Sequence, residues 1–325
     1  MQIQFKEGES NYLGFSGALG EGGKVLIIMM KPLICVFTPT YNRANLLPEL
    51  YKSLQDQTSF NFKWLVVDDG SEDNTAELVA KWQKEENKFQ IDYIYKQNGG
   101  LHTGYNTAIE NMDTELCMCI DSDDKLPPNA IEKIENIWNK IKDKGYIGIV
   151  GLDCDTKGKV IKDYLPDVTD IYAYEVKYKY HIQGDKKYIH KTDILKAVAP
   201  IPTFPGEKIL NPFMLFLEAD KYGKLYCVNE FFCIVEYREG GMTDSMISQY
   251  NNSPRGFAER RKKIMTIPGM GWAFLFKTNI HYVSSCYLAK RLKYAVKESP
   301  KKLWTFLAFP FGVLLGIYIK RANKK

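Results

Sequence analysis

The sequence predicts an α/β fold, in which a mixed, mainly parallel sheet carries helices on both faces and is followed by a helical, apolar and basic C-terminal appendage. Short β-rich runs alternate with segments of helical length from Leu33 onward. Strands that are separated by helices pair in parallel and are covered on both faces. The 325 residues, 45% of them apolar, are ample for a core and exclude a disordered chain.

The expected elements follow one another in a regular order. Pro127 and Pro128 precede one predicted helix, where proline is tolerated because the first turn needs no backbone donor. No G-x-G-x-x-G motif follows the first strand, so a dinucleotide-binding fingerprint is absent. The predicted strands lie at 33–38, 62–67, 91–96, 115–120, 146–152 and 231–237, and the predicted helices at 46–57, 75–86, 103–112 and 129–142.

Residues 1–30 show neither a strand period nor a helix period, so we expect an irregular leader. Their one apolar run, at 25–30, is too short and too far from the start for a signal peptide. We hypothesise that the true start is Met29 or Met30.

The seven cysteines are scattered and form no paired spacing of the kind that binds zinc. His181 and His190 also lack metal-ligand spacing. We expect all seven cysteines to be reduced, buried and non-catalytic, which indicates a cytoplasmic setting.

Charge divides the chain into two unequal parts. From Asn251 to Lys325 there are sixteen Lys or Arg against Glu259 and Glu298, a balance of +14, which leaves −9 for residues 1–250 out of the total of +5. Because Trp, Phe and Leu are interleaved with these basic residues, the pattern favours an anionic membrane surface as partner and disfavours nucleic acid.

The run at 303–319 carries no charge and has lysines or arginines on both sides. Seventeen helical residues span roughly 25 Å, slightly less than the hydrocarbon core of a bilayer, and we expect Pro310 and Gly312 to break the helix. A monotopic or re-entrant anchor is therefore favoured over a full span or a buried terminal helix. We predict that residues 253–325 form a membrane-associating tail.

Two clusters of carboxylates follow predicted strands. Asp68 and Asp69 end the second strand, and Asp121, Asp123 and Asp124 follow the fourth. The carboxyl ends of parallel strands meet at one edge of a sheet, where α/β proteins bind ligands. An acidic edge would repel a phosphate unless a divalent cation neutralised it. The sequence therefore predicts Mg²⁺ or Mn²⁺ at one cluster and recognition of a nucleobase at the other.

Four motifs in register resemble the nucleotide-sugar half of family 2 glycosyltransferases with the GT-A fold. They are TPTYNR at 38–43, VDDGSEDNT at 67–75, QNGGLHTGYNTAI at 97–109 and DSDD at 121–124. The likeness continues weakly through GEK at 206–208 and EYREGGMT at 236–243, and it fades near Asn252. The resemblance implies a GT-A domain over about 31–252, with a nucleotide-sugar half at about 33–125 and an acceptor half at about 126–252.

The resemblance assigns roles to individual residues. It implies that Tyr41 stacks on the base, that Asp69 accepts the N3 proton of uracil, and that Gly99 and Gly100 allow close approach of the diphosphate. The alternatives are ordinary turn and loop chemistry. Family members often carry Lys or Arg at the position of Leu101, which leaves His102 as the nearby polar side chain. The implied nucleotide-sugar contacts are Thr38, Pro39, Tyr41, Arg43, Asp69, Asn98, Gly99, Gly100, His102, Asn106, Asp121, Ser122 and Arg238.

The same resemblance supplies a metal site and a base. Asp123 is the first choice as metal ligand and Asp124 the alternative. Glu207 is the implied catalytic base, although Lys208 stands where many relatives have Asp, and a surface Glu paired with Lys is the alternative. Arg238 either reaches a phosphate or pairs with a neighbouring glutamate.

Taken together, these features predict an inverting glycosyltransferase that moves a sugar from a nucleotide-sugar donor, a UDP-sugar, to a hydroxyl of a glycan or lipid-linked acceptor. We expect it on the cytoplasmic face of a bacterial membrane, in envelope polysaccharide biosynthesis. A non-catalytic nucleotide-sugar-binding adaptor and a nucleotidyltransferase remain as alternatives.

Overall fold

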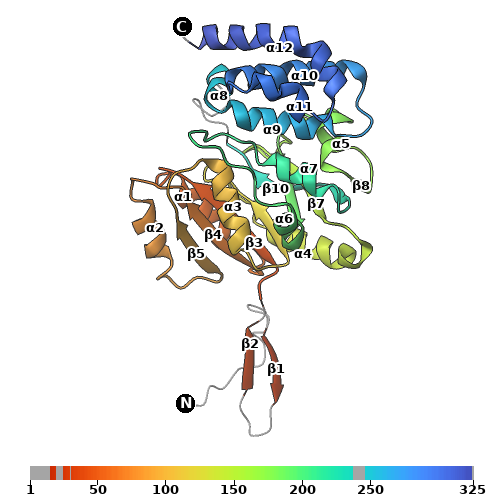
Figure 1. Cartoon of the computed structure of the whole chain (residues 1–325). Helices are drawn as coiled ribbons and strands as arrows, with labels where there is room; N and C mark the ends of the chain where they lie inside the picture. Colours follow the sequence, from red (N-terminus) through yellow and green to blue (C-terminus); the bar gives the residue numbers. More distant parts are fainter. Residues whose placement is uncertain (1–14, 20–24, 30, 237–245, 324–325) are drawn as a thin grey trace.

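An eight-stranded sheet with helices on both faces forms the centre of the computed structural model, which describes residues 15–19, 25–29, 31–236 and 246–323 (Figure 1). The strand order is β5-β4-β3-β6-β9-β7-β10-β8. The strands are β3 Ile34–Thr40, β4 Phe62–Asp68, β5 Gln90–Tyr95, β6 Leu116–Cys119, β7 Gly148–Cys154, β8 Asp170–Ile171, β9 Lys186–Lys191 and β10 Leu225–Ile234. The predicted mixed, mainly parallel α/β sheet is therefore confirmed.

Helices cover the two faces of this sheet and enclose two apolar cores. The first core lies between the sheet and α1 (Leu47–Gln55), α2 (Thr75–Trp82) and α4 (Ala130–Ile141). The second lies between the sheet and α3 (Leu101–Asn111), α5 (Ala173–Tyr178), α6 (Thr192–Val198) and α7 (Phe213–Ala219). The four helices predicted before residue 145 are all present, with ends shifted by a few residues.

Six strands run in one direction, because β3, β4, β5 and β6 pair in parallel, and β7 and β10 pair in parallel on the far side of β9. Strand β9 is antiparallel to both of its neighbours. The sequence analysis missed β9 because its six residues, KKYIHK, include three lysines and a histidine and show no apolar alternation. The insertion of β9 brings Lys186 and Lys187 to the edge at which the six parallel strands end.

The C-terminal helices build a third, smaller core. They are α8 (Met246–Asn252), α9 (Pro254–Met265), α10 (Trp272–Leu288), α11 (Ala295–Glu298) and α12 (Lys302–Ala322). Their core includes Tyr282, Val283 and Ala295, with Phe309 and Val313 packed against it. Figure 1 shows α10 between α9 and α12, with α12 outermost.

The prediction that Pro310 and Gly312 break the last helix is wrong, because α12 runs through Pro310 without interruption. Gly312 serves close packing against α10, because a Cβ at this position would lie 2.4 Å from the Cβ of Val283. Gly316 meets Tyr287 in the same way. The small residues therefore form the face of α12 that lies against α10.

The leader also differs from the expectation of an irregular segment. Residues Phe15–Leu19 (β1) and Val25–Met29 (β2) pair as a two-stranded antiparallel sheet, with Phe15 opposite Met29 (Figure 1). Antiparallel pairing of neighbouring segments satisfies their backbone groups without any amphipathic period. The rest of the leader, residues 1–14, 20–24 and 30, lies outside the described residues.

Candidate active site

The carboxyl ends of β3, β4, β6 and β7 place most of the predicted site residues along one edge of the sheet. Strand β4 ends at Asp68, β6 leads into the acidic turn at 121–124, and β7 ends with Asp153 and Cys154. The antiparallel strand β9 starts at the same edge with Lys186 and Lys187. The fold therefore brings together the two acidic clusters that are more than fifty residues apart in sequence.

Asp68 is fully engaged inside the chain. One carboxylate oxygen accepts the backbone N–H of Ser71 at 2.7 Å, and the other accepts the hydroxyl of Tyr93 at 2.7 Å. The side chain is buried, and its role is to close the turn after β4.

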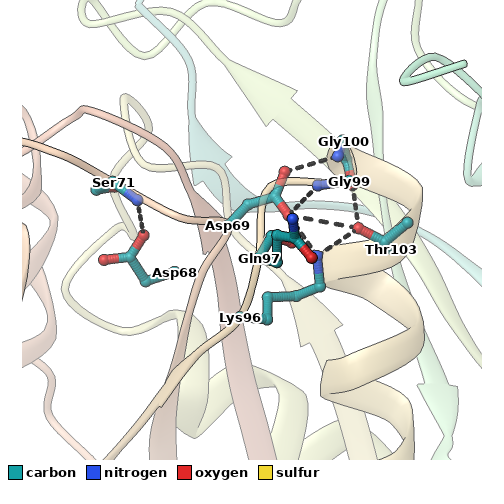
Figure 2. A network of polar contacts seen from close by, with 8 residues as sticks. All are labelled: Asp68, Asp69, Ser71, Lys96, Gln97, Gly99, Gly100 and Thr103. Carbon is teal, nitrogen blue, oxygen red and sulfur yellow. Dashed lines mark hydrogen bonds and ion pairs between the residues drawn. The ribbon is translucent and has the colours of Figure 1, made fainter. Parts of the chain in front are cut away.

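Asp69 holds the loop that precedes α3 (Figure 2). Its Oδ1 accepts the N–H of Gly99 at 2.9 Å and the ammonium of Lys96 at 2.5 Å, and its Oδ2 accepts the N–H of Gly100 at 2.7 Å. The backbone N–H groups of the two glycines that the resemblance places near the diphosphate are thus bonded to Asp69. Oδ2 accepts one of these bonds and retains a lone pair for a further donor.

Gly100 brings two loops that are distant in sequence into contact. Its φ of +93° lies in the left-handed region, and a Cβ there would meet the carbonyl oxygen of Lys208 at 2.0 Å. Only glycine lets the 206–208 loop approach this closely. The GEK loop therefore lies directly against the loop that Asp69 holds.

His102 is a correction to the predicted diphosphate contacts. The side chain is 2% exposed, and burial lowers the pKa of its imidazole, partly offset by the Asp69 charge. A neutral, buried imidazole supplies no positive charge to a phosphate, because desolvation disfavours the protonated form.

Thr38 and Pro39 are buried and Asn106 is half-buried, and the contacts of these residues lie within the chain, so their donor contacts stay predictions. The hydroxyl of Thr38 accepts the indole N–H of Trp64 at 3.0 Å, and Pro39 packs against Gly104. The amide of Asn106 exchanges two hydrogen bonds with the backbone of Ile201, at 2.7 and 2.8 Å. These residues shape the walls of the edge.

Tyr41, Arg43 and Asn98 remain placed for ligand contact. Tyr41 is 45% exposed just after β3. Arg43 reaches the acidic turn, with its Nη1 at 3.3 Å from Oδ2 of Asp123. The Oδ1 of Asn98 is buried and has no hydrogen-bond partner among the described residues, so it can accept a donor from a ligand.

The acidic turn concentrates negative charge. Burial, followed by the charges of Asp121 and Asp123, raises the pKa of the Asp124 carboxyl to about 7. Desolvation of the carboxylate by the surrounding protein, and then the charge of Asp123, raise the pKa of Asp121 as well. Ser122 is buried within the turn. Like charges held this close favour capture of a cation.

Sequence reasoning missed two members of this cluster, Asp153 and Lys187. Asp153 is 1% exposed, its Oδ1 has no hydrogen-bond partner among the described residues, and burial raises its pKa to about 6. Burial lowers the pKa of the Lys187 ammonium, but the charges of Asp153, Asp124 and Asp121 outweigh it and leave the pKa well above its usual value. The signal for Lys187 was its place at the start of β9, which the sequence analysis did not recognise.

The donor set fits a cation that is shared with a ligand. Across the described residues, no group of three His, Cys, Asp or Glu side chains is preassembled around a metal position. Mg²⁺ and Mn²⁺ are commonly held by one or two carboxylates together with the phosphates of a substrate. Asp123 and Asp124 offer two carboxylates of this kind, and Asp123 lies toward Arg43.

Glu207, the predicted base, is used structurally. Its two carboxylate oxygens accept the backbone N–H groups of Arg255 and Gly256 at 3.0 and 2.9 Å, which caps the start of α9. The neighbouring carboxylates Glu218 and Asp220 are further candidates for the base, and both are engaged as well. Glu218 pairs with Lys263 and Lys221, and Asp220 caps α5 through the N–H groups of Ala173 and Tyr174. The contacts of these three carboxylates oppose a role as base. Arg238 lies outside the described residues.

Solved structures of known proteins share this fold. A crystal structure of S. aureus TarS in complex with UDP-GlcNAc matches with a TM-score of 0.56 and 20% identity, over 86% of this chain and 79% of that one. The mannosyltransferase PcManGT of Pyrobaculum calidifontis, in complex with GDP-Man and Mn²⁺, matches with a TM-score of 0.52 and 14% identity, over 95% and 91%. The expected GT-A-like fold is confirmed.

Sequence relatives point the same way over part of their length. A glycosyltransferase of Rickettsia typhi is 35% identical over 137 residues, which cover 42% of this chain and 42% of the relative. A putative teichuronic acid biosynthesis glycosyltransferase of Bacillus subtilis, TuaG, is 30% identical over 103 residues, or 32% of this chain and 40% of TuaG. The matched part thus spans less than half of these relatives.

The sequence model of the family described as "Glycosyl transferase family 2" matches residues 35–196. This range includes all four motifs of the acidic edge and the strands β3 to β9 that position them. The chain therefore belongs to glycosyltransferase family 2.

Proposed function

We propose that this glycosyltransferase moves a sugar, with inversion, from a UDP-sugar to a hydroxyl of a glycan or lipid-linked acceptor. The observation that carries the proposal is the acidic turn, Asp121 to Asp124, beside the loop held by Asp69 at one edge of the sheet. The TarS crystal structure contains UDP-GlcNAc, and the solved structure of PcManGT is a complex with GDP-Man and Mn²⁺. TuaG, a bacterial relative, supports a role in envelope polysaccharide synthesis.

The chain's own residues divide the work of donor binding. Tyr41 offers an exposed ring on which a base stacks. Asp69 accepts the N3–H of uracil on the lone pair left on Oδ2, and the unpartnered Oδ1 of Asn98 accepts a donor from the nucleotide or the sugar. Asp123 and Asp124 would hold the divalent cation, whose positive charge would offset that of the diphosphate leaving group.

The transfer needs a carboxylate base on the acceptor side. Asp185 lies directly before β9 and is exposed, and its charge raises the pKa of Asp121 and of Asp153. We assign the base to Asp185. It takes the proton of the acceptor hydroxyl while that oxygen bonds to the anomeric carbon and the bond from that carbon to the diphosphate oxygen breaks.

The test is release of UDP and formation of a glycoside from a panel of UDP-sugars and GDP-sugars, with Mn²⁺, with Mg²⁺ and with EDTA. We expect UDP release from at least one UDP-sugar with either cation, and none in EDTA. A non-catalytic adaptor would bind the nucleotide sugar without releasing UDP. Preference for GDP-sugars would overturn the donor class.

We further propose that α12 lies against the cytoplasmic face of a membrane, next to a catalytic domain that ends near residue 252. α12 is long and apolar enough to cross a membrane by length and composition alone. In the structure one side packs on α10, and an apolar side is exposed with basic residues at both ends of the helix. The exposed large apolar side chains of α12 are Leu303, Phe306, Leu307, Phe311, Leu314 and Tyr318.

Sedimentation with vesicles that contain an anionic lipid tests this surface. Phe306→Ser with Leu314→Ser should lower vesicle binding by about tenfold or more, because each buried side chain contributes roughly 1.5–3 kcal/mol. Tyr164→Ser with Tyr222→Ser removes two equally exposed aromatic residues far from the tail in sequence and should leave binding unchanged. Equal loss in both variants would contradict the proposal.

A further inference from the structure

A cluster of positive charge lies between the catalytic domain and the tail. Lys177 and Tyr178 end α5, Arg260 and Arg261 lie on α9, and His281 lies on α10. The charges of Arg260 and Arg261 act on both Lys177 and Tyr178. In the part of the chain that the structure describes, no carboxylate lies within ion-pair distance of Lys177, Arg260 or Arg261.

Two polar atoms of this cluster are buried without a hydrogen-bond partner among the described residues. They are Nε of Arg261 and Nδ1 of His281. The guanidinium of Arg261 donates from Nη2 to Oη of Tyr250 at 3.3 Å, which leaves its Nε–H unused. Buried donors without acceptors cost free energy unless a ligand satisfies them.

The charges in the cluster repel one another. Although Lys177 as a whole is exposed, desolvation of its ammonium and then the charge of Arg260 lower its pKa, while Asp185 is the carboxylate that raises it. Burial and the charge of Arg260 also lower the pKa of Arg261, whereas Tyr250 and Tyr178 raise it. Burial, Arg261 and Lys277 lower the pKa of His281 to about 4. An anion would relieve this repulsion and accept the unused donors.

We propose that Lys177, Arg260 and Arg261 bind a phosphate group of the acceptor. This inference rests on the proposed function, which it deepens by naming a phosphate-bearing acceptor, such as a lipid-linked sugar phosphate. Asp185 connects the two sites, since it directly precedes β9, which begins at the acidic edge beside the end of β7, and its charge acts on Lys177 of the basic cluster. A phosphate on the cluster therefore places an acceptor hydroxyl near the proposed base.

The position of the cluster favours the acceptor over a membrane headgroup. The apolar side of α12 is the surface offered to a bilayer, and α10 lies between α12 and α9 (Figure 1). Arg260 and Arg261 come from α9, on the catalytic side of α10. Headgroup binding would instead couple the cluster to vesicle attachment.

Calorimetry with farnesyl phosphate and with farnesol, which share one hydrocarbon and differ in the phosphate, tests the site. The full chain is titrated in neutral detergent with EDTA, because removal of the metal prevents binding at the metal-dependent donor site. We expect farnesyl phosphate to bind at least about tenfold more tightly than farnesol, and inorganic pyrophosphate to displace it. Equal binding of the two ligands would overturn the proposal.

Variants locate the binding. Lys177→Gln with Arg260→Gln should remove the preference for the phosphate, while Lys263→Gln, one turn along α9 and paired with Glu218, should keep it. Lys177→Gln alone alters an exposed side chain and should lower the preference at least threefold even if the double variant does not fold. An unchanged preference in Lys177→Gln rejects the site.

Two further readouts separate this site from the other proposals. In the absence of acceptor, the double variant should still release UDP from the donor. If the wild type released no UDP, the proposed function would be wrong, whereas the anion site would be unaffected by that result. Vesicle binding should also be unchanged in the double variant. A loss as large as that of the α12 variant would assign the cluster to lipid headgroups.

Discussion

The acidic edge and the basic cluster are two regions of one molecule that solve opposite electrostatic problems. At the edge, burial together with the charge of Asp121 raises the pKa values of Asp124 and Asp153, and Lys187 is the internal cation. In the cluster, Lys177 and Arg261 have lowered pKa values with Asp185 as the acidic neighbour. Each region holds an excess of one charge that a ligand of the other sign would balance.

The difference teaches how one enzyme could handle two phosphate-bearing substrates. In the function proposed above, a diphosphate would reach the acidic edge together with a divalent cation, whereas a phosphate would reach the basic cluster without one. Substitutions at the acidic edge should therefore affect metal-dependent UDP binding, and substitutions in the basic cluster should affect binding of the phosphate. The following variants test whether they do.

The largest effect is expected at the acidic turn. Asp123→Ala removes a carboxylate proposed to hold the cation, so UDP release should fall by several orders of magnitude, as it should in wild type treated with EDTA. Asp143→Ala, which alters an exposed aspartate far from the edge in sequence, is the matched control. Activity of Asp123→Ala near that of the control would show that the turn holds no essential cation.

The next largest effect separates the proposed base from the helix cap. Asp185→Asn should lower transfer by about 10²–10⁴ while UDP still binds, because the amide cannot accept the proton. Glu207→Gln should instead lower the free energy of unfolding by about 1 kcal/mol, since it weakens the bonds that cap α9. Kinetics and chemical denaturation of both variants measure this, and the reverse pattern would restore Glu207 as the base.

A smaller effect is expected at the nucleobase. Asp69→Ala should weaken UDP binding by roughly 1–3 kcal/mol, through loss of the uracil bond and release of the Gly99–Gly100 loop. Glu72→Ala, three residues on and exposed, is the control. Calorimetry with UDP and Mn²⁺ decides, and equal affinities in the two variants would remove Asp69 from donor binding.

The smallest effect concerns stability rather than activity. Burial raises the pKa of Asp153 from 3.8 to about 6, so this group costs wild type stability as pH rises from about 4 to about 6. In Asp153→Asn that loss disappears, and the free energy of unfolding should gain about 3 kcal/mol relative to wild type across this range. Asp155→Asn is the control of opposite sign, because backbone N–H groups lower the pKa of Asp155. Parallel stability curves for Asp153→Asn and wild type would refute the shift.

The sequence was sufficient for the elements with a clear period and for the acidic edge. Strand-end carboxylates such as Asp69 and Asp123 could be placed because parallel strands end together. Strand β9 was missed because its lysines hide the period, and with it Lys187. The uses of Glu207 and His102 depend on which backbone groups the fold brings beside them, at Arg255 and Lys208, and local sequence carries no record of those partners.

The tail shows the same limit. Its basic and apolar composition was visible in the sequence, whereas the continuity of α12 depends on how Gly312 meets Val283. Tertiary packing overrode the local helix-breaking tendency of Pro310. The basic cluster, which needs α5, α9 and α10 together, had no sequence signal at all.

A crossed calorimetric experiment tests the separation of the two regions most directly. Asp123→Ala and the Lys177→Gln, Arg260→Gln double variant are each titrated with UDP plus Mn²⁺ and, in EDTA, with farnesyl phosphate. We predict that Asp123→Ala loses most of its UDP affinity and keeps farnesyl phosphate binding, and that the double variant does the reverse. The account would be contradicted if either folded variant lost binding of both ligands, or if both variants kept binding of both ligands.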